Sequence, residues 1–192
     1  MADISALSNL QGGDPLDFDI YVDAKEASAP PPKGRYVVRT EAITFGATQA
    51  GFLSAQIDPT IVGPSHEGFK FNFTKVSAKP FKRGAATVSQ LGDYLRATGS
   101  QARPKTPQEQ ADAVEATAGA TLQVDVDWEA YDKETKYTLK GMEKFPKNAD
   151  GTFDVWTTVP DPNNPGKVCL GEDGQPRRIR ARAKIDRYVS AS

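Results

Sequence analysis

Residues 122–129 read Leu-Gln-Val-Asp-Val-Asp-Trp-Glu and carry the clearest secondary-structure pattern in the chain. Apolar and polar residues alternate with a period of two. Because successive side chains of a β-strand point to opposite faces, the pattern predicts a strand with one buried and one acidic face. We expect Leu122, Val124 and Val126 to face the core. Residues 131–139 are expected to return as its hairpin partner.

Other segments of the chain have the same β-like composition. They are rich in β-branched and aromatic residues and are separated by Gly, Pro, Asn and Asp, which favour turns. The predicted strands are residues 34–45, 52–62, 69–76, 153–159 and 177–189.

Two short helices are predicted between the first strands and residue 122. Apolar residues recur at helical spacing from Val88 to Leu95, and Gly99 stands where a left-handed C-terminal cap belongs. The second helix starts at Thr106, with Pro107 at its first position and Glu109 completing a capping box. The chain is therefore expected to be mainly β with two short α-helices.

The length and composition predict one soluble domain. A chain of 192 residues is long enough to bury one core, and its uncharged apolar runs are far shorter than the roughly 20 residues that span a bilayer. The single cysteine, Cys169, excludes an internal disulfide and agrees with a reducing compartment. We expect a cytoplasmic protein, without contact with membranes, whose domain covers residues 33–192.

Residues 1–32 are predicted to form an acidic arm that ends in a proline-rich spacer. Leu16, Phe18, Ile20 and Val22 alternate with Asp17, Asp19, Tyr21 and Asp23. This pattern fits either an acidic edge strand or a separate arm. Because three consecutive prolines form a stiff spacer, we expect the arm to pack little against the domain and to compete with nucleic acid for a basic face.

Charge is segregated along the chain, although the net charge is only −1. Residues 1–32 carry one basic and six acidic side chains, and residues 106–150 carry five and ten. By contrast, residues 33–105 carry eleven basic and four acidic side chains, and residues 151–192 carry seven and five. This distribution is compatible with a basic face that binds a phosphate backbone, and equally with ordinary solvated surface charge.

The sequence lacks the usual residues of catalysis. The only histidine, His66, lies in a Gly/Pro turn, and one His and one Cys are too few for a zinc site. No phosphate-binding glycine loop is present. We therefore expect no enzymatic activity, no cofactor and no metal. Asp125, Asp127 and Glu129 would project from one strand face, so a metal-dependent nuclease is an alternative, but a solvated acidic face is the favoured interpretation.

Two basic segments contain the candidate residues for binding nucleic acid. In the first, Phe69, Phe71 and Phe73 alternate with polar residues and are expected to form a core face, which leaves the opposite face for a ligand. Single-strand binders combine cations for phosphates with aromatic rings for bases. The candidates in this segment are Lys70, Lys75, Lys79, Phe81, Lys82 and Arg83.

The second segment is the last predicted strand. Its apolar residues Ile179, Ala181 and Ile185 are expected to face the core, while its basic residues line the other face and contact phosphates. An edge strand protected from aggregation by its charges explains the same pattern. The candidates are Arg178, Arg180, Arg182 and Lys184.

The chain resembles phage-encoded single-stranded DNA-binding proteins with an OB-type barrel. The likeness rests on a strand-rich N-terminal half, a helix reading Leu91-Gly92-Asp93-Tyr94-Leu95-Arg96-Ala97-Thr98-Gly99, and a later β-segment that ends in basic residues. It covers roughly residues 33–140 and leaves out the region after Phe145. The resemblance implies a β-barrel, OB-like fold with additional C-terminal strands, and a role in phage DNA replication or recombination with proteins of those processes as partners.

The sequence therefore predicts a non-catalytic protein that binds single-stranded DNA. The alternative is a phage virion or assembly protein whose β-sandwich makes protein contacts only.

Overall fold

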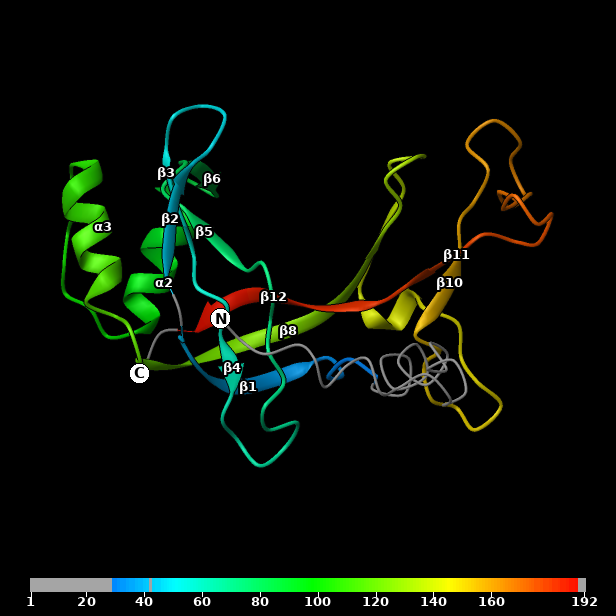
Figure 1. Ribbon diagram of the computed structural model, residues 1–192, viewed down its shortest axis with the longest axis horizontal. Coiled ribbons are helices and arrows are strands. Elements are labelled where there is room, and N and C mark those ends of the chain that lie inside the picture. The colour runs from blue at the N-terminus through cyan, green and yellow to red at the C-terminus, as the bar shows by residue number, and fades with distance from the viewer. Residues whose placement is uncertain (1–28, 42, 190–192) are drawn as a thin grey trace, which may run out of the picture.

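The computed structural model describes residues 29–41 and 43–189, which form short strands and two short α-helices (Figure 1). The predicted class, mainly β with two helices, is confirmed. The predicted acidic arm lies outside the described residues up to residue 28. The elements are β1 (Gly34–Arg39), β2 (Thr44–Ala47), β3 (Leu53–Gln56), β4 (Thr60–Ile61), β5 (Lys75–Ser77), β6 (Phe81–Arg83), β7 (Ala86–Val88), α2 (Gln90–Ala97), α3 (Pro107–Glu115), β8 (Thr121–Tyr131), β9 (Thr138–Lys140), the 3-10 helix η2 (Met142–Lys144), β10 (Trp156–Thr158), β11 (Arg178–Arg180) and β12 (Arg182–Val189).

Strand β8 organises the largest sheet. The strand order is β12-β8-β1-β4, all antiparallel, and β9 pairs with the end of β8. Leu122, Val124 and Val126 are buried, as predicted from the alternation. The predicted hairpin partner is confirmed at β9, where the Asp132 carboxylate accepts hydrogen bonds from the N–H and hydroxyl of Thr135 and so closes the turn.

The remaining described strands form three smaller sheets, with orders β2-β3-β5, β6-β7 and β10-β11. Figure 1 shows β8 and β12 running side by side along the molecule, from the part that carries α2 and α3 to the part that carries β10 and β11. The β8–β12 ribbon therefore contributes to both parts.

Both helices form where the capping residues predicted them. The Thr106 hydroxyl accepts from the Glu109 N–H, and the Glu109 carboxylate accepts from the Thr106 N–H, which completes the capping box of α3. Helix α2 is capped by Ser89, and Gly99 follows it with a positive φ of 77°. No helix within residues 29–41 and 43–189 is long and apolar enough to cross a membrane.

The buried apolar residues form two clusters. The larger one lies between the β8 sheet, the β2-β3-β5 sheet and both helices, and includes Val38, Val76, Tyr94 and Val124. The Tyr94 hydroxyl contacts the hydroxyls of Thr40 at 2.9 Å and of Thr117 at 2.7 Å, which ties α2 to the ends of β1 and α3.

The smaller cluster lies at the other end of the β8–β12 ribbon. It is built from Trp128, Ala130, Phe145 and Ala181, with Ile179 packed against it. The ring of Trp128 meets that of Phe145 edge to face at 5.5 Å. Ile185 packs against the larger cluster. The prediction that Ile179, Ala181 and Ile185 face the core is thus confirmed, although they belong to two clusters.

Two predicted strands are divided in the structure. The segment 34–45 divides after Arg39 into β1 and β2, which belong to different sheets. The segment 52–62 breaks into β3 and β4 at Asp58, whose φ is 28°, and Pro59, which has no N–H to donate to a sheet.

The predicted strand 69–76 is wrong over most of its length, because residues 71–74 make a turn and β5 starts only at Lys75. Phe71 is buried and Phe69 packs beside it, but Phe73 is 81% exposed with a φ of 60°. The expected core face of three phenylalanines therefore loses Phe73, since a residue in the left-handed region breaks the period of two.

The proline spacer packs against the domain, which corrects the expectation for the end of the arm. Pro30 and Pro31 are buried. The Trp128 indole N–H donates to the Pro31 carbonyl at 2.8 Å, and the Tyr36 hydroxyl donates to the Pro32 carbonyl at 2.8 Å. Because two aromatic side chains hold these carbonyls, the polypeptide is anchored at this point.

Candidate nucleic-acid interface

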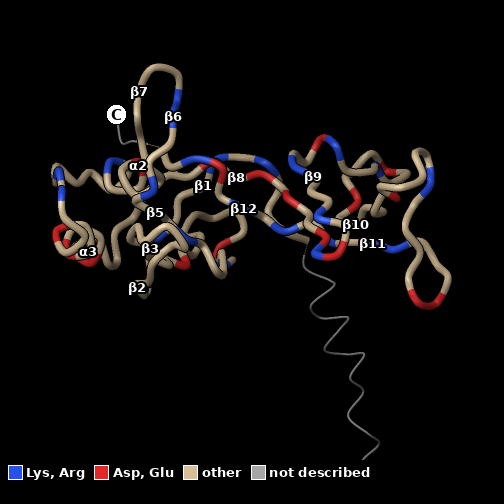
Figure 2. The backbone as a smooth tube through the Cα atoms, turned by 90° about the horizontal axis from the view of Figure 1, so that it is seen from above, with Lys and Arg blue, Asp and Glu red and all other residues tan. Residues whose placement is uncertain are grey.

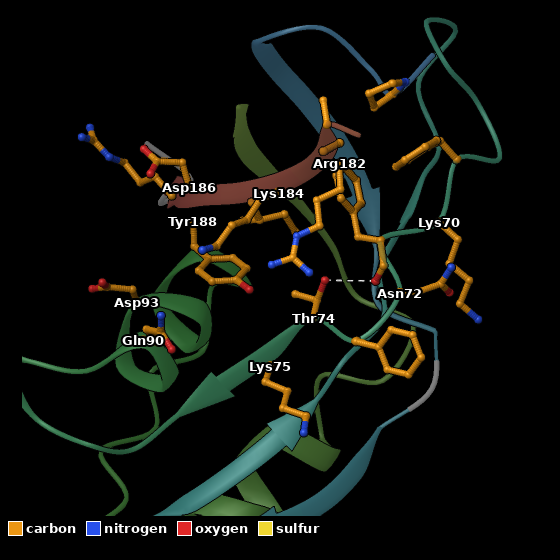
Figure 3. Close-up of a pocket in the computed structure, with 18 of the residues that line it drawn as sticks. Lys70, Asn72, Thr74, Lys75, Gln90, Asp93, Arg182, Lys184, Asp186 and Tyr188 are labelled. Carbon is orange, nitrogen blue, oxygen red and sulfur yellow. Dashed lines mark hydrogen bonds between the residues drawn. The ribbon is translucent and has the colours of Figure 1, made fainter. Parts of the chain in front are cut away.

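A groove of about 960 Å³ lies between β12 and residues 69–75, and residues of β6 and α2 also line it (Figure 3). We refer to residues 69–75 as the loop bank and to β12 as the strand bank. Figure 3 shows Arg182, Lys184 and Tyr188 on the strand bank and Lys70 and Lys75 on the loop bank. Two basic segments more than 100 residues apart in the sequence thus meet in one groove.

The groove follows the edge of the large sheet. β12 is the last strand in the order β12-β8-β1-β4, and consecutive residues from Arg180 to Tyr188 all line the groove. Side chains of a strand point alternately to the two faces, so a cavity that touches consecutive residues borders the edge of the strand and not one face. The groove therefore borders the side of β12 on which no other described strand pairs with it.

Positive charge predominates around the groove. Among the described residues that line the groove, Asp93 and Asp186 are the only ones with a carboxylate. The basic side chains that line it are Lys70, Lys75, Arg83, Arg180, Arg182, Lys184 and Arg187. Clustered cations of this kind raise the local concentration of an anionic ligand.

Seven of the ten predicted binding residues line the groove, and three do not. Lys79 and Lys82 are exposed outside it, and the Lys82 ammonium donates to the Thr87 hydroxyl across the β6–β7 hairpin. Arg178 lies in β11, where it pairs with Asp154 at 3.0 Å and stacks over Trp156 at 5.6 Å. The seven are Lys70, Lys75, Phe81, Arg83, Arg180, Arg182 and Lys184.

The predicted single row of four basic residues is therefore corrected in part. The chain stays extended, but it passes from the β10-β11 sheet into the large sheet at Ala181, whose N–H donates to the Val155 carbonyl. Arg178 thus belongs to a different sheet from Arg182 and Lys184, because the sheet that a strand joins depends on its neighbours and not on its own alternation.

The cations of the strand bank are held by a carboxylate on the neighbouring strand. The Arg182 guanidinium bonds to Glu129 at 3.0 Å, and the Lys184 ammonium bonds to the other oxygen of the same carboxylate. Glu129 is 7% exposed. Burial alone raises its pKa, but the hydrogen bonds from Lys184 and Arg182 more than offset this, so its pKa lies below the ordinary range.

This pairing continues along β8. The Arg35 guanidinium bonds to Asp125 at 2.8 Å and lowers the pKa of that carboxyl. Lys33 pairs with Asp127 at 3.1 Å. Figure 2 shows basic and acidic segments interleaved where β8 and β12 run side by side.

The acidic face of β8 is consequently paired with cations. Asp125, Asp127 and Glu129 each bond to Lys or Arg. The described part of the chain contains no group of three or more His, Cys, Asp or Glu side chains that could hold a metal ion.

The cations of the loop bank are held differently. Neither Lys70 nor Lys75 forms an ion pair with any described residue, and both side chains are exposed. Arg83, on the β6–β7 hairpin that projects from the body in Figure 2, pairs with Asp93 at 2.6 Å and lies 5.4 Å from the ring centre of Phe81.

Phe73 stands out among the groove side chains because its ring is exposed while its backbone is fixed. The turn that carries it is held by hydrogen bonds: the Thr74 N–H donates to the Asp58 carboxylate at 3.0 Å, and the Thr74 hydroxyl donates to the Phe71 carbonyl at 3.0 Å. The Phe71 N–H donates to the Pro59 carbonyl at 2.9 Å. A bulky residue at positive φ is unfavourable, and such residues cluster at binding sites.

Three groove residues were missed from the sequence. Phe73 was assigned to the core because no local signal marks its left-handed backbone. Tyr188 lines the groove and packs edge to face on Tyr94 at 5.6 Å. Arg187 reaches the charged face only because a bulge between Ile185 and Arg187 shifts the alternation and places Arg187 opposite Asp125.

Within residues 29–41 and 43–189, these features define a mainly β fold with two short α-helices and a cationic groove along the edge of the large sheet. The chain belongs to a family of proteins of unknown function (DUF669), whose family model matches residues 18–151. The match includes β8 and both helices and ends before β12. No curated protein and no solved structure matches the chain.

Proposed function

We propose that this protein binds single-stranded DNA, without catalysis, in the groove between the loop bank and the strand bank. The observation that carries the proposal is the meeting of Lys70 and Lys75 with Arg182 and Lys184 around the exposed ring of Phe73. Cations neutralise phosphates, and an exposed ring offers a surface on which any base can stack.

The aromatic rings favour a single strand over a duplex. Phe73 and Phe81 line the groove with exposed rings. Bases stack on aromatic side chains only when they are free of pairing partners and neighbouring bases, whereas a duplex presents mainly its phosphates. A groove that uses both kinds of contact is therefore selective for the unpaired strand.

The biological setting follows from the resemblance described above. We propose an OB-like arrangement of the large sheet with the β2-β3-β5 sheet around the larger core, and a role in phage DNA replication or recombination in the host cytoplasm. The two sheets packed on one core and the ligand groove beside them support this arrangement.

The first prediction tests the phosphate contacts. Affinity for an oligo-dT strand is measured by fluorescence anisotropy over a range of salt concentrations, for the wild type and for Lys70→Ala/Lys75→Ala. Each phosphate contact contributes roughly −0.7 to the slope of log affinity against log salt for single strands, so the double variant should flatten the slope by about 1.4.

The control is Lys133→Ala/Lys140→Ala, which removes two exposed lysines from the β8–β9 hairpin, outside the groove. It should leave the slope close to that of the wild type. If both double variants have the same slope of log affinity against log salt, the groove is not the site that binds the phosphates. If the wild type shows no salt-dependent binding of the strand at all, the alternative of a virion or assembly protein takes its place.

A further inference from the structure

The β10–β11 sheet carries a second aromatic and basic surface beside the groove. We propose that a DNA strand which fills the groove continues onto this sheet, where one of its bases stacks on Trp156 and a phosphate bonds to Arg178. This extended site rests on the proposed function, because the groove supplies its first part.

The two faces of the β10–β11 sheet differ in their surroundings. Thr157 and Ile179 lie opposite each other in the register, and the first is buried while the second packs against the smaller cluster. Because side chains of a strand alternate between its faces, the residues on either side of these two lie on the other face, which we refer to as the outer face. The outer face consists of Trp156, Thr158, Arg178 and Arg180.

Trp156 is a large aromatic side chain whose ring is only partly buried. Among the described residues it belongs to neither apolar cluster. Its position is nevertheless fixed, because one oxygen of Asp154 accepts from the Trp156 N–H at 2.9 Å and the other accepts from the Arg178 guanidinium at 3.0 Å. That guanidinium lies 5.6 Å from the centre of the indole ring. A ring that is held in place before the ligand binds costs little ordering, and it offers a surface for stacking a base.

The outer face joins the groove at Arg180. This residue lines the groove and is the direct register partner of Trp156, so the Cβ atoms of the two residues lie roughly 4.5 to 5.5 Å apart. The odd-numbered residues of 179–185 all pack with the two apolar clusters, so the basic residues between them all point away from the core. Figure 1 shows β12 continuing from β11 along the molecule. A DNA strand that leaves the groove at Arg180 therefore reaches Trp156 next.

The pairing of Arg178 sets the size of the expected effect. Its guanidinium is half exposed and is shared between the Asp154 carboxylate and the Trp156 ring. A base can stack on the ring only after the guanidinium has moved, and the guanidinium can then bond to a neighbouring phosphate. Because this exchange breaks one ion pair, we expect Trp156 to add less affinity than Phe73.

The chain provides a specific signal for this contact, since it contains only two tryptophans. Trp128 is 5% exposed, and its indole N–H donates to the Pro31 carbonyl, so no base can stack on it. A base stacked on an indole quenches its fluorescence. Quenching of the tryptophan emission by DNA therefore reports on Trp156.

The experiment uses the full chain and oligo-dT strands of about 5 and about 16 nucleotides, which lie near the two ends of the range bound by a single OB fold. Anisotropy measures affinity and tryptophan emission measures stacking, for the wild type, Trp156→Ala and Trp156→Phe. The control is Phe45→Ala, which removes an exposed ring from β2, outside both the groove and the outer face.

We expect the long strand to quench the emission of the wild type, and the short strand, which is held in the groove, to leave it nearly unchanged. Trp156→Ala should weaken binding of the long strand about fivefold, the lower end of the range for base stacking, and leave that of the short strand unchanged. Trp156→Phe should keep the affinity for the long strand and lose the quenching. Phe45→Ala should match the wild type in both readouts.

Three results would overturn the contact with Trp156. They are an unchanged emission of the wild type with the long strand, quenching that persists in Trp156→Phe, and equal affinities of the wild type and Trp156→Ala for the long strand. If circular dichroism shows that Trp156→Ala is unfolded, the wild type and Trp156→Phe still decide, because both keep an aromatic side chain at this position.

Failure of the proposed function gives a different result. If Lys70→Ala/Lys75→Ala leaves both affinities unchanged while the long strand still quenches Trp156, the outer face binds DNA and the groove does not. If both strands bind in the groove without quenching, the proposed function stands and the extension fails. If neither strand binds, both are wrong.

Discussion

The two banks of the groove carry the same charge but hold it in different ways. On the strand bank, Arg182 and Lys184 share the buried carboxylate of Glu129. On the loop bank, Lys70 and Lys75 have no carboxylate partner among the described residues, and Phe73 exposes its ring. A cation that already pairs with a carboxylate contributes less binding free energy to a new anion than an unpaired cation does, since the first ion pair must be broken. The loop bank is therefore expected to supply most of the affinity, and the strand bank to adjust it.

The largest effect is expected from Phe73→Ala on the loop bank. Base stacking on one aromatic ring is worth about 1 to 3 kcal/mol, so oligo-dT affinity should fall roughly 5- to 150-fold. Phe73→Trp should retain the affinity because it keeps a stacking surface. The control is Phe45→Ala, which removes an exposed ring from β2, away from the groove. Anisotropy titrations with all three variants measure the difference.

Phe73→Gly tests whether the Phe73 ring contributes to DNA binding or to the stability of the fold. Glycine adopts a positive φ without strain, so this variant should be as stable as the wild type or up to about 1 kcal/mol more stable, while it loses the same affinity as Phe73→Ala. Thermal unfolding followed by circular dichroism gives the stability. A large loss of stability would mean that the ring supports the fold, and would contradict its assignment to the ligand.

The strand bank should respond in the opposite direction. Glu129→Gln removes the carboxylate from Arg182 and Lys184 and should tighten oligo-dT binding about threefold to tenfold at low salt, because both cations become available to phosphates. It should also lower the free energy of unfolding by about 1 kcal/mol, since the buried carboxylate loses its charge and its hydrogen bonds from two exposed cations are weakened.

The matched control is Glu143→Gln. It also removes one carboxylate that is paired with a lysine, but its partner Lys33 lies outside the groove. If both variants tighten binding equally, net charge is the cause and the distinction between the banks fails. Weaker binding by Glu129→Gln would show that the carboxylate positions the two cations for the ligand.

The sequence predicted the regular elements because their signals are local. The alternation in residues 122–129 needs only a period of two to identify β8, and Thr106, Pro107 and Glu109 mark the start of α3 through bonds within four residues. The seven groove residues found in advance share a simple feature, namely a charged or aromatic side chain in or beside a predicted strand.

What the sequence could not predict depends on contacts between distant segments. The exposure of Phe73 requires the turn that Asp58 holds, and the position of Arg187 requires a bulge in β12. The division of residues 177–189 between two sheets depends on β8 and β10, which are the neighbours of β12 and β11. The alternation of apolar and polar residues along the sequence predicts none of these features, because each arises from pairing between distant segments.

The smallest expected effect is the pH dependence of the strand bank. The pKa of Glu129 is lowered in the folded protein below the ordinary value of 4.5 for a glutamate, which remains its value in the unfolded chain. The ionised carboxylate therefore stabilises the fold fully above about pH 4.5, and this contribution is lost as the pH falls through the lowered value. Denaturant unfolding of the wild type and Glu129→Gln should differ by about 1 kcal/mol at pH 7 and converge on acidification, because Gln has no proton to bind.

Glu172→Gln, in an exposed turn without an ion pair to a described residue, gives the baseline for losing a carboxylate. A constant difference between the wild type and Glu129→Gln from pH 7 down to the acid limit of the fold would show that the Glu129 side chain stabilises the protein by its packing and not by its charge, and the strand bank would then hold its cations no more tightly than the loop bank does.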